Sequence, residues 1–593
     1  MSNRALYLRA AEDLRPNDGQ WQAYESKDHC VVLAGPGSGK TKTLTIKLAR
    51  MLSEEIETPR GVACITYNNE CARELEHRLA GLGVEPSKRV FIGTVHSFSL
   101  TQILLPYGPS LEIGLPNEFN VATQQQQQTA LENAYIEAVG GPGNPQNAKF
   151  GMNLYRRSIL DRTKPEWRDR DQQQALLVET YERHLRASGL IDFDDMPLLA
   201  LRALRQNKWL RKALVAKFPV LAVDEYQDLG RALHQMVMGL CFHSGMQLLA
   251  VGDADQSIYG FIGAHPELLQ RLSEREDVET VSLGLNYRCG SRIVEASEYA
   301  LGEERGYKVP ETAATGTVHF HPLTRGYGAH ADHFFSTILP AIEMRNPDLT
   351  PGQIGILYPA AFLGDEVAQA AESHGYGIIR TDANSLYPRS SKLMRWLEQC
   401  AAWCCDGWRT GNPRWTRIVA EGGRLFSEAL VTNEKKREFG RYLLALMWQR
   451  RDSQHGIYDW LVEVRHNLLS TLVLFGRTLT DDKIVLDTFV GRVGPEGDIE
   501  NMTLGQFSGV GEGNDRVNLS SLHSAKGREF DVTVLFGMDS GRVPRANASQ
   551  ADIIAARRLF YVGFTRARSE LHMVYSAHNP SPFVTEVEER LVF

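Results

Sequence analysis

The sequence has little of what would build a metal centre or a membrane segment. Its eight cysteines include no Cys-x-x-Cys pair, so we expect reduced, mostly buried thiols rather than zinc or iron–sulfur ligands. No window approaches the roughly 18 apolar residues of a membrane span, and the first residues have no apolar signal core. We therefore expect a cytoplasmic protein with no membrane partner.

The chain also lacks an excess of positive charge. It has 65 Lys and Arg against 72 Asp and Glu, which gives a formal net charge of −7 at pH 7. Because no global basic field attracts a polyanion, nucleic acid would have to bind in a local groove, by base stacking as well as by phosphate contacts. A chain of 593 residues is too long for one hydrophobic core, so we expect about four domains.

Short apolar runs rich in β-branched residues predict strands in both halves of the chain. In the first half they lie at residues 30–33, 62–66, 90–94, 220–223, 248–251 and 280–283. In the second half they lie at residues 317–321, 354–357, 376–380, 517–522, 532–536 and 571–575. Helical patterns separate most of them, and this alternation indicates an α/β fold with two parallel sheets.

Two stretches do not fit the sheets. Residues 100–192 are polar and helical in character, and we expect their glutamine run, Gln124–Gln128, to lie in a helix. Residues 382–514 contain six of the nine tryptophans, a density that indicates a packed domain rather than a linker. We interpret both stretches as insertions, one into each sheet domain.

The segment from Cys30 to Thr41 has the pattern of a buried strand, a glycine-rich loop and a helix start, with Ala34 where the strict signature has glycine. Glycines let successive backbone N–H groups turn around phosphates, and the helix N-terminus adds partial positive charge. We expect Lys40 to reach the β- and γ-phosphates of ATP and Thr41 to ligate Mg²⁺. The predicted ATP-binding residues of this loop are Gly35, Pro36, Gly37, Ser38, Gly39, Lys40 and Thr41.

An apolar strand that ends in adjacent carboxylates provides the second part of such a site. Asp224, at the end of this strand, suits Mg²⁺, and Glu225 suits the base that orients and deprotonates the attacking water. These residues predict a P-loop NTPase that acts by hydrolysis. Kinases, switches and transport ATPases all remain open at this point.

A longer series of motifs narrows the choice. Residues 248–263 (LLAVGDADQSIYGFIG) are similar to the linking motif of UvrD/Rep-type helicases of superfamily 1. Other motifs resemble those of the family in the same order: Gln20 with Trp21, ACITYNNECARELEHR at 63–78, IGTVHSF at 92–98, NYR at 286–288, SLHSAKGREF at 521–530 and RRLFYVGFTRAR at 557–568. Their joint occurrence is far more specific than any one of them.

The resemblance implies two RecA-like domains, each with a mainly helical insertion. The first would comprise residues 1–99 and 193–284, with its insertion at 100–192. The second would comprise residues 285–381 and 515–593, with a shortened insertion at 382–514.

The same resemblance implies roles for residues around the nucleotide. Gln256 matches the glutamine that senses the γ-phosphate and couples it to the DNA path. Arg288 and Arg566 match two arginine fingers, which stabilise charge on the transferred phosphoryl group. With Lys40 and Glu225, these residues form the predicted catalytic set.

Three further residues match family contacts to the nucleoside. Tyr287 matches the residue that stacks on adenine, Gln20 the one that reads the base edge, and Glu529 a ribose contact. Arg528 stands where the family more often has leucine, so the packing around Glu529 is expected to differ.

A motor that moves along nucleic acid needs grip that is independent of sequence, and aromatic faces provide it by stacking on bases. By resemblance, the stacking residues are Tyr67, Phe193, Tyr259 and Phe261, while Thr94, His96 and His523 contact phosphates or sugars. Phe261 replaces the family's usual tryptophan and Ile262 its usual arginine. A smaller ring and a missing cation predict weaker grip at that pocket.

The resemblance therefore implies an ATP- and Mg²⁺-dependent helicase that moves 3′ to 5′ on single-stranded DNA and acts at junctions of single and double strands, in repair or replication. The alternative is a motor or sensor subunit of a nuclease or anti-phage defence complex that unwinds little by itself. The short second insertion, the end of the chain soon after the last motif and the altered stacking pocket favour that alternative. A P-loop kinase or switch would have no use for the two arginine motifs.

Overall fold

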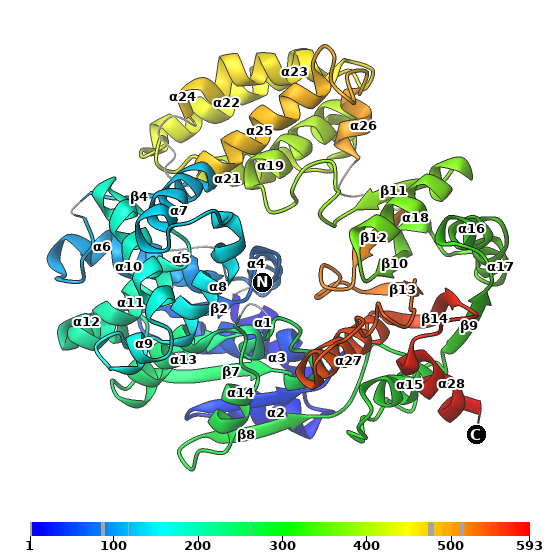
Figure 1. Ribbon diagram of the computed structural model, residues 1–593, viewed down its shortest axis with the longest axis horizontal. Helices are drawn as coiled ribbons and strands as arrows, with labels where there is room; N and C mark the ends of the chain where they lie inside the picture. Colours follow the sequence, from blue (N-terminus) through cyan, green and yellow to red (C-terminus); the bar gives the residue numbers. More distant parts are fainter. Residues whose placement is uncertain are drawn as a thin grey trace. The chain divides into compact units, whose positions relative to one another are not determined.

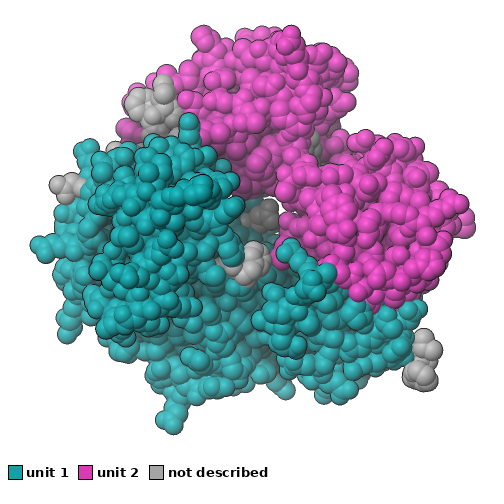
Figure 2. Space-filling view, viewed as in Figure 1, with its two compact units in different colours: residues 1–318, 543–570, 582–593 teal, residues 319–542, 571–581 magenta. Residues whose placement is uncertain are grey.

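The computed structural model describes residues 3–84, 89–116, 118–260, 263–472, 479–509 and 515–592. Contacts divide the chain into two compact units, coloured separately in Figure 2. Unit 1 comprises residues 1–318, 543–570 and 582–593, and unit 2 comprises residues 319–542 and 571–581. The boundaries that the sequence predicts for four domains stay predictions.

A six-stranded parallel sheet forms the centre of unit 1. Its strand order is β3-β2-β6-β7-β1-β8, with bounds β1 Cys30–Ala34, β2 Val62–Thr66, β3 Val90–Thr94, β6 Val220–Val223, β7 Gln247–Gly252 and β8 Glu279–Leu283. Most of these residues are buried, because helices cover both faces of a parallel sheet. Two further strands, β4 Asn120–Val121 and β5 Leu190–Ile191, form a separate two-stranded sheet.

The helices of unit 1 follow the strands along the chain (Figure 1, blue to green, with α27 and α28 in red). They are α1 Asn3–Glu12, α2 Asp18–Glu25, α3 Lys40–Arg50, α4 Asn69–Gly81, α5 Val95–Phe98, α6 Leu105–Tyr107, α7 Gln124–Ala138, α8 Pro145–Ser158, α9 Glu166–Asp169, α10 Gln172–Ala187, α11 Asp195–Gln206, α12 Lys208–Lys217, α13 Arg231–Val237, α14 Glu267–Ser273, α15 Ser291–Leu301, α27 Gln550–Phe564 and α28 Pro582–Val592.

A second six-stranded sheet has the order β11-β12-β10-β13-β14-β9. Its strands are β9 Thr317–Leu323, β10 Ile354–Tyr358, β11 Gly377–Arg380, β12 Arg516–Ser521, β13 Phe530–Phe536 and β14 Ala567–Ser576. β10 pairs in parallel with both β12 and β13, and β11 pairs in parallel with β12. The predicted α/β fold with two parallel sheets is therefore confirmed, and every strand predicted from the sequence overlaps an observed one.

The helices of unit 2 fall into two groups. α16 Tyr327–His333, α17 Leu339–Arg345 and α18 Ala361–Ser373 accompany the sheet, and a helical group contains α19 Lys392–Ala402, α20 Trp408–Thr410, α21 Trp415–Leu425, α22 Asn433–Gln449, α23 Ile457–Val464, α24 Ser470–Leu472, α25 Thr480–Val493 and α26 Leu504–Ser508. Trp396, Trp403 and Trp460 are buried in the core of this group, whereas Trp408 and Trp448 are partly exposed. The tryptophan-rich stretch is thus a packed helical region, as predicted.

The helical insertion of unit 1 has its own core. α7 and α10 pack together, and Trp167 is buried beside them with Ala130 and Ala134. The glutamine run occupies the first turns of α7, where Thr123 and Gln126 form a capping box. The prediction that these glutamines lie in a helix is confirmed. None of the helices among the described residues is long and apolar enough to cross a membrane.

Candidate functional site

The predicted nucleotide residues of unit 1 follow neighbouring strands at one edge of the first sheet. β6, β7 and β1 are consecutive in the sheet and run parallel, so their carboxyl ends meet at the same edge, where ligands bind in open α/β sheets. The phosphate loop follows β1, Asp224 and Glu225 follow β6, and residues 253–256 follow β7.

The loop after β1 is shaped by two glycines with positive φ. Gly37 has φ 65° and Gly39, which caps α3, has φ 80°, values that disfavour residues with a Cβ. A Cβ on Gly37 would also lie 2.5 Å from Asn286 Oδ1. Gln20 Nε2 donates to the Ser38 carbonyl at 2.7 Å, so the segment before β1 fixes the loop that leads into α3.

The amino group of Lys40 is buried beside the strand-end carboxylates. Its Nζ lies 4.0 Å from Glu225 Oε1 and has no hydrogen-bond acceptor among the residues that the structure describes. A buried ammonium group is costly unless it is paired. An anionic ligand at the loop, such as the phosphates of ATP, would supply the missing acceptors, so this observation fits a nucleotide.

Burial raises the pKa values of two carboxylates at the strand ends. Burial and then the neighbouring Glu225 carboxylate raise the pKa of Asp224 to about 7, although Lys40 opposes the shift. Burial likewise raises the pKa of Asp253 to about 6. A divalent cation would favour the ionised form of both groups. Thr41, in the first turn of α3, and Asp224 are thus suitable ligands for Mg²⁺.

Glu225 has an unusual backbone conformation. Its φ of 52° and ψ of 44° lie in the left-handed region, which non-glycine residues seldom adopt. Strained residues of this kind concentrate at functional sites. The Gln227 side chain donates to Glu225 Oε2 at 2.5 Å and accepts from the Asp253 backbone N–H at 3.0 Å. This glutamine therefore links the segment after β6 to the segment after β7.

Arg566 reaches this cluster from a segment far along the chain. It is 2% exposed, and its Nη2 donates to Gln256 Oε1 at 3.3 Å. Gln256 Nε2 in turn donates to Asp253 Oδ2 at 2.8 Å. The arginine is fixed at the end of α27 because its Nε donates to the Val562 carbonyl at 3.0 Å.

Arg288 and Tyr287 approach the same loop. The Tyr287 N–H donates to the Gly37 carbonyl at 2.9 Å, and Arg288 Nη1 donates to the Thr565 carbonyl at 3.0 Å. Asn286 Oδ1 accepts from the Arg288 N–H at 2.8 Å and so shapes this turn. Tyr287 is 49% exposed, which fits a ring that stacks on a base. The structure thus gathers Lys40, Glu225, Gln256, Arg288 and Arg566 within unit 1.

The predicted DNA residues of unit 1 form two aromatic pairs. Tyr67, after β2, and Tyr259 stack with ring centroids 4.4 Å apart. His96, after β3, lies 5.4 Å from Phe193, and burial lowers the pKa of its imidazole, which favours the neutral form. Phe193 is 53% exposed. The two tyrosines cover each other in part, so Phe193 is the most exposed of these four rings.

Other predicted contacts have a different status. Thr94 Oγ1 accepts from the Ser97 N–H at 3.2 Å and caps α5, so it has a structural use besides any DNA contact. Phe261 and Ile262 lie outside the described residues. His523 and Glu529 belong to unit 2, between β12 and β13, and their roles stay predictions.

Two family models match the segments that contain most of this site. Residues 16–277 match the UvrD/REP helicase N-terminal domain, and residues 499–578 match the UvrD-like helicase C-terminal domain. Together the two matches cover more than half of the chain, and they contain the phosphate loop, the strand-end carboxylates and Arg566. The chain belongs to the UvrD/Rep helicase family.

Relatives within this helicase family match over nearly the whole chain. It is 26% identical to the ATP-dependent DNA helicase Rep of Escherichia coli, over 94% of this chain and 90% of that protein. It is 24% identical to DNA helicase II of Escherichia coli, over 97% of this chain and 88% of that protein. It is also 24% identical to the ATP-dependent DNA helicase PcrA of Leuconostoc citreum, over 97% and 85% respectively.

Two residues of this UvrD/Rep-family site were not predicted from the sequence. Asp253 accepts from Gln256 and has a raised pKa. Its position directly after a buried strand, like that of Asp224, is the feature from which it could have been predicted. Arg305 makes a two-pronged ion pair with Asp255, with distances of 2.7 and 2.8 Å. No local pattern distinguishes Arg305 from the many surface arginines of this chain.

Proposed function

We propose that this chain is an ATP-dependent DNA helicase that moves along single-stranded DNA and separates the strands of a duplex at a single-strand junction. The observation that carries the proposal is the contact between Arg566 and Gln256, residues 310 positions apart, beside the phosphate loop. It supports a site in which one arginine can respond to the nucleotide and to the segment after β7. A binding protein or a simple switch would not need this connection.

The residues of the cluster divide the chemistry of ATP hydrolysis among them. Lys40 would pair with the phosphates and Glu225 would accept a proton from the attacking water. Arg288 and Arg566 would stabilise the charge that develops on the transferred phosphoryl group. Mg²⁺, held by Thr41 and Asp224, would neutralise phosphate charge. Tyr287 and Gln20 would hold the adenine, and Glu529 the ribose.

The short segment after β7 offers a path from ATP to DNA. Gln256 contacts Arg566, and three residues later Tyr259 stacks on Tyr67. A shift of Gln256 when ATP is hydrolysed would therefore be passed along a few bonds to the aromatic pair. Such a movement would change the grip on a stacked base and so advance the strand.

The proposed DNA track comprises Tyr67, Thr94, His96, Phe193, Tyr259, Phe261 and His523. Exposed aromatic faces fit single-stranded DNA of any sequence, because every base has a face on which a ring can stack. The proposed direction, 3′ to 5′, is supported by family membership alone. The four predicted domains complete the proposal.

A strand-displacement assay with an ATPase measurement tests the function. We expect single-stranded oligo(dT) to stimulate hydrolysis and a duplex with a 3′ single-stranded tail to be unwound. A duplex with a 5′ tail is the control for direction, and Lys40→Ala is the control for contaminating helicase. ATPase that DNA does not stimulate would overturn the proposal, and unwinding of the 5′-tailed duplex alone would overturn the direction.

The second candidate is a motor or sensor subunit of a nuclease or anti-phage defence complex. The replacement of the family's tryptophan by Phe261 and of its arginine by Ile262 favours it, because both changes weaken grip on DNA. This candidate predicts DNA-stimulated ATPase with little strand displacement, and recovery of a nuclease with the chain when it is purified from its native host.

A further inference from the structure

Phe193 lies in a short segment in which aspartates flank it on both sides. This segment connects β5 to α11, and its sequence from Leu190 is Leu-Ile-Asp-Phe-Asp-Asp. Asp192 and Asp195 are 3% and 2% exposed, whereas Phe193, between them, is 53% exposed. Buried carboxylates require partners, and the partners here come from the helical insertion of unit 1.

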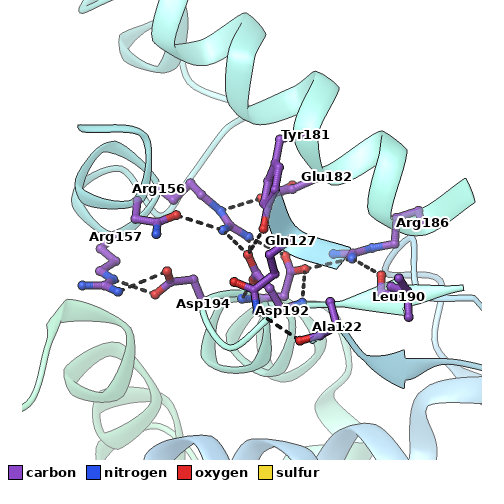
Figure 3. Close-up of polar contacts among 12 residues, drawn as sticks. Ala122, Gln127, Arg156, Arg157, Tyr181, Glu182, Arg186, Leu190, Asp192 and Asp194 are labelled. Atoms are coloured by element: carbon purple, nitrogen blue, oxygen red, sulfur yellow. Dashed lines mark hydrogen bonds and ion pairs between the residues drawn. The ribbon is translucent and has the colours of Figure 1, made fainter. Parts of the chain in front are cut away.

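Arg156 of α8 holds the two buried carboxylates. Its side chain is fully buried, and its terminal nitrogens donate to Asp192 at 2.7 and 3.0 Å and to Asp195 at 2.9 Å. Its Nε donates to Glu182 of α10 at 3.0 Å. Figure 3 shows the guanidinium group pointing from its helix to Asp192, with Tyr181 and Glu182 around it. All three nitrogens of Arg156 are therefore used.

The backbone on both sides of Phe193 depends on the same carboxylates. The Asp195 N–H donates to Asp192 Oδ1 at 2.8 Å, and the Asp192 N–H donates to Asp195 Oδ2 at 3.1 Å. Tyr181 donates its hydroxyl to Asp192 at 2.9 Å. Each carboxylate thus links the insertion to a backbone N–H one or two residues from Phe193. These links fix the direction of the Phe193 side chain.

The third carboxylate is held by the next residue of α8. Arg157 donates to Asp194 at 2.6 and 3.1 Å, a pair that lies apart from the Arg156 contacts in Figure 3. Two consecutive arginines of one helix therefore bind the three aspartates that surround Phe193. Geometry of this kind, with two-pronged bonds, fixes orientation as well as distance.

We propose that Arg156 is a positioning residue for DNA binding: it holds Phe193 in the orientation in which the ring stacks on a base beside His96. The inference rests on the proposed function, in which Phe193 is part of the DNA track. Arg156 has no exposed surface and cannot touch DNA itself, so its effect must pass through the Asp192–Asp195 segment. The helical insertion thereby becomes part of the DNA site.

The test measures how the ATPase rate depends on the concentration of oligo(dT). Arg156→Lys keeps the charge but offers one nitrogen in place of three. We expect the oligo(dT) concentration for half-maximal stimulation to rise by about 10-fold, within the range that loss of one stacked base allows. Turnover at saturating oligo(dT) should stay within about 2-fold of the parent, because the nucleotide cluster is untouched.

Arg162→Lys is the matched control. Arg162 belongs to the same ion network, but among the described residues it donates only to Glu182, at 2.6 and 2.8 Å. It binds none of the aspartates beside Phe193. We expect its half-maximal oligo(dT) concentration to equal that of the parent. A rise equal to that of Arg156→Lys would mean that general loosening of the insertion is responsible, and would overturn the inference.

A double substitution decides whether Arg156 acts through Phe193. Phe193→Ala alone should weaken stimulation, and adding Arg156→Lys should weaken it no further, since coupled residues are not additive. Independent, multiplying effects would overturn the positioning role. If Phe193→Ala has no effect, the proposed DNA track is wrong at this ring and the inference falls with it. Failure of the proposed function itself would show in the parent chain, as ATPase that oligo(dT) does not stimulate.

Asp194→Asn provides a second route if Arg156→Lys does not fold. It removes the carboxylate bound by Arg157 and leaves the buried aspartates in place. A positioning role predicts weaker stimulation by oligo(dT). Removal of a negative charge beside a polyanion would by itself predict stronger stimulation. The sign of the change therefore decides, and stronger stimulation would overturn the inference.

Discussion

Unit 1 contains two buried ionic clusters that differ in how their charges are compensated. Around Arg156, each nitrogen of the guanidinium donates to a carboxylate. Around Lys40, the ammonium group lacks a hydrogen-bond acceptor among the described residues, and Asp224 and Asp253 have raised pKa values. The first cluster is complete in the protein chain alone. The second is arranged for charges that a ligand and a cation would bring.

The largest expected effect is a loss of ATP turnover when the Lys40 cluster is changed. Glu225→Gln and Lys40→Ala should lower ATP turnover by about 10²- to 10⁴-fold, because a general base or a phosphate-binding charge is lost. Glu225→Gln should still bind ATP and single-stranded DNA. Turnover is measured by phosphate release and binding by fluorescence anisotropy. Glu57→Gln, at an exposed carboxylate, is the control, and loss of DNA binding in Glu225→Gln would contradict the assigned role.

The second prediction compares the clusters by stability. Arg156→Met leaves two buried carboxylates, Asp192 and Asp195, without their shared partner, so it should lower the free energy of unfolding by about 3–5 kcal/mol. Lys40→Met removes a poorly compensated charge and should change stability by less than about 1 kcal/mol. Urea unfolding followed by circular dichroism measures both. Equal losses would show that the two clusters are compensated alike.

Of the two clusters, only the one around Lys40 could be predicted from the sequence. The strands were predictable because buried parallel strands are continuous apolar runs, and the nucleotide residues lie in short motifs at strand ends. β4 and β5 were missed because two residues give no periodic signal. The Arg156 cluster joins residues 156, 182, 192 and 195 from three elements, and its pairing exists only in the folded chain.

The third prediction concerns pH, to which Glu182 of the Arg156 cluster and Asp253 of the Lys40 cluster should respond with opposite sign. Burial would raise the pKa of Glu182, but Arg156 and Arg162 lower it from 4.5 to about 2. Its contribution to stability is therefore complete above pH 4.5 and lost as the pH falls toward 2. The pKa of Asp253 is raised from 3.8 to about 6, so its contribution is lost as the pH rises through that range.

Single substitutions separate the two contributions. Glu182→Gln should flatten the fall in stability below pH 4.5, and Asp253→Asn should flatten the fall between pH 3.8 and about 6. Urea unfolding at pH 3 to 7 in the absence of nucleotide and divalent cations measures both slopes. Slopes of the same sign at the two sites would contradict the comparison.

The smallest expected effect is the loss of stability when a solvent-exposed ion pair is broken, which serves as a reference for the buried pairs. Arg78 and Glu74 are one helical turn apart in α4, 2.6 Å from each other, and both are about half exposed. Arg78→Ala should cost about 0.3–0.5 kcal/mol and less at high salt. Urea unfolding at low and high salt measures it. A loss comparable to that of Arg156→Met would show that burial does not explain the difference.

The order of segments in unit 1 has a consequence for synthesis of the protein. Unit 1 is built from residues 1–318 and residues 543–570 and 582–593, with most of unit 2 encoded between them. A growing polypeptide contains the phosphate loop and Gln256 long before the ribosome adds Arg566. It could not complete the arginine contact with Gln256. The contact on which the proposed function rests can therefore form only after nearly the whole chain has been synthesised.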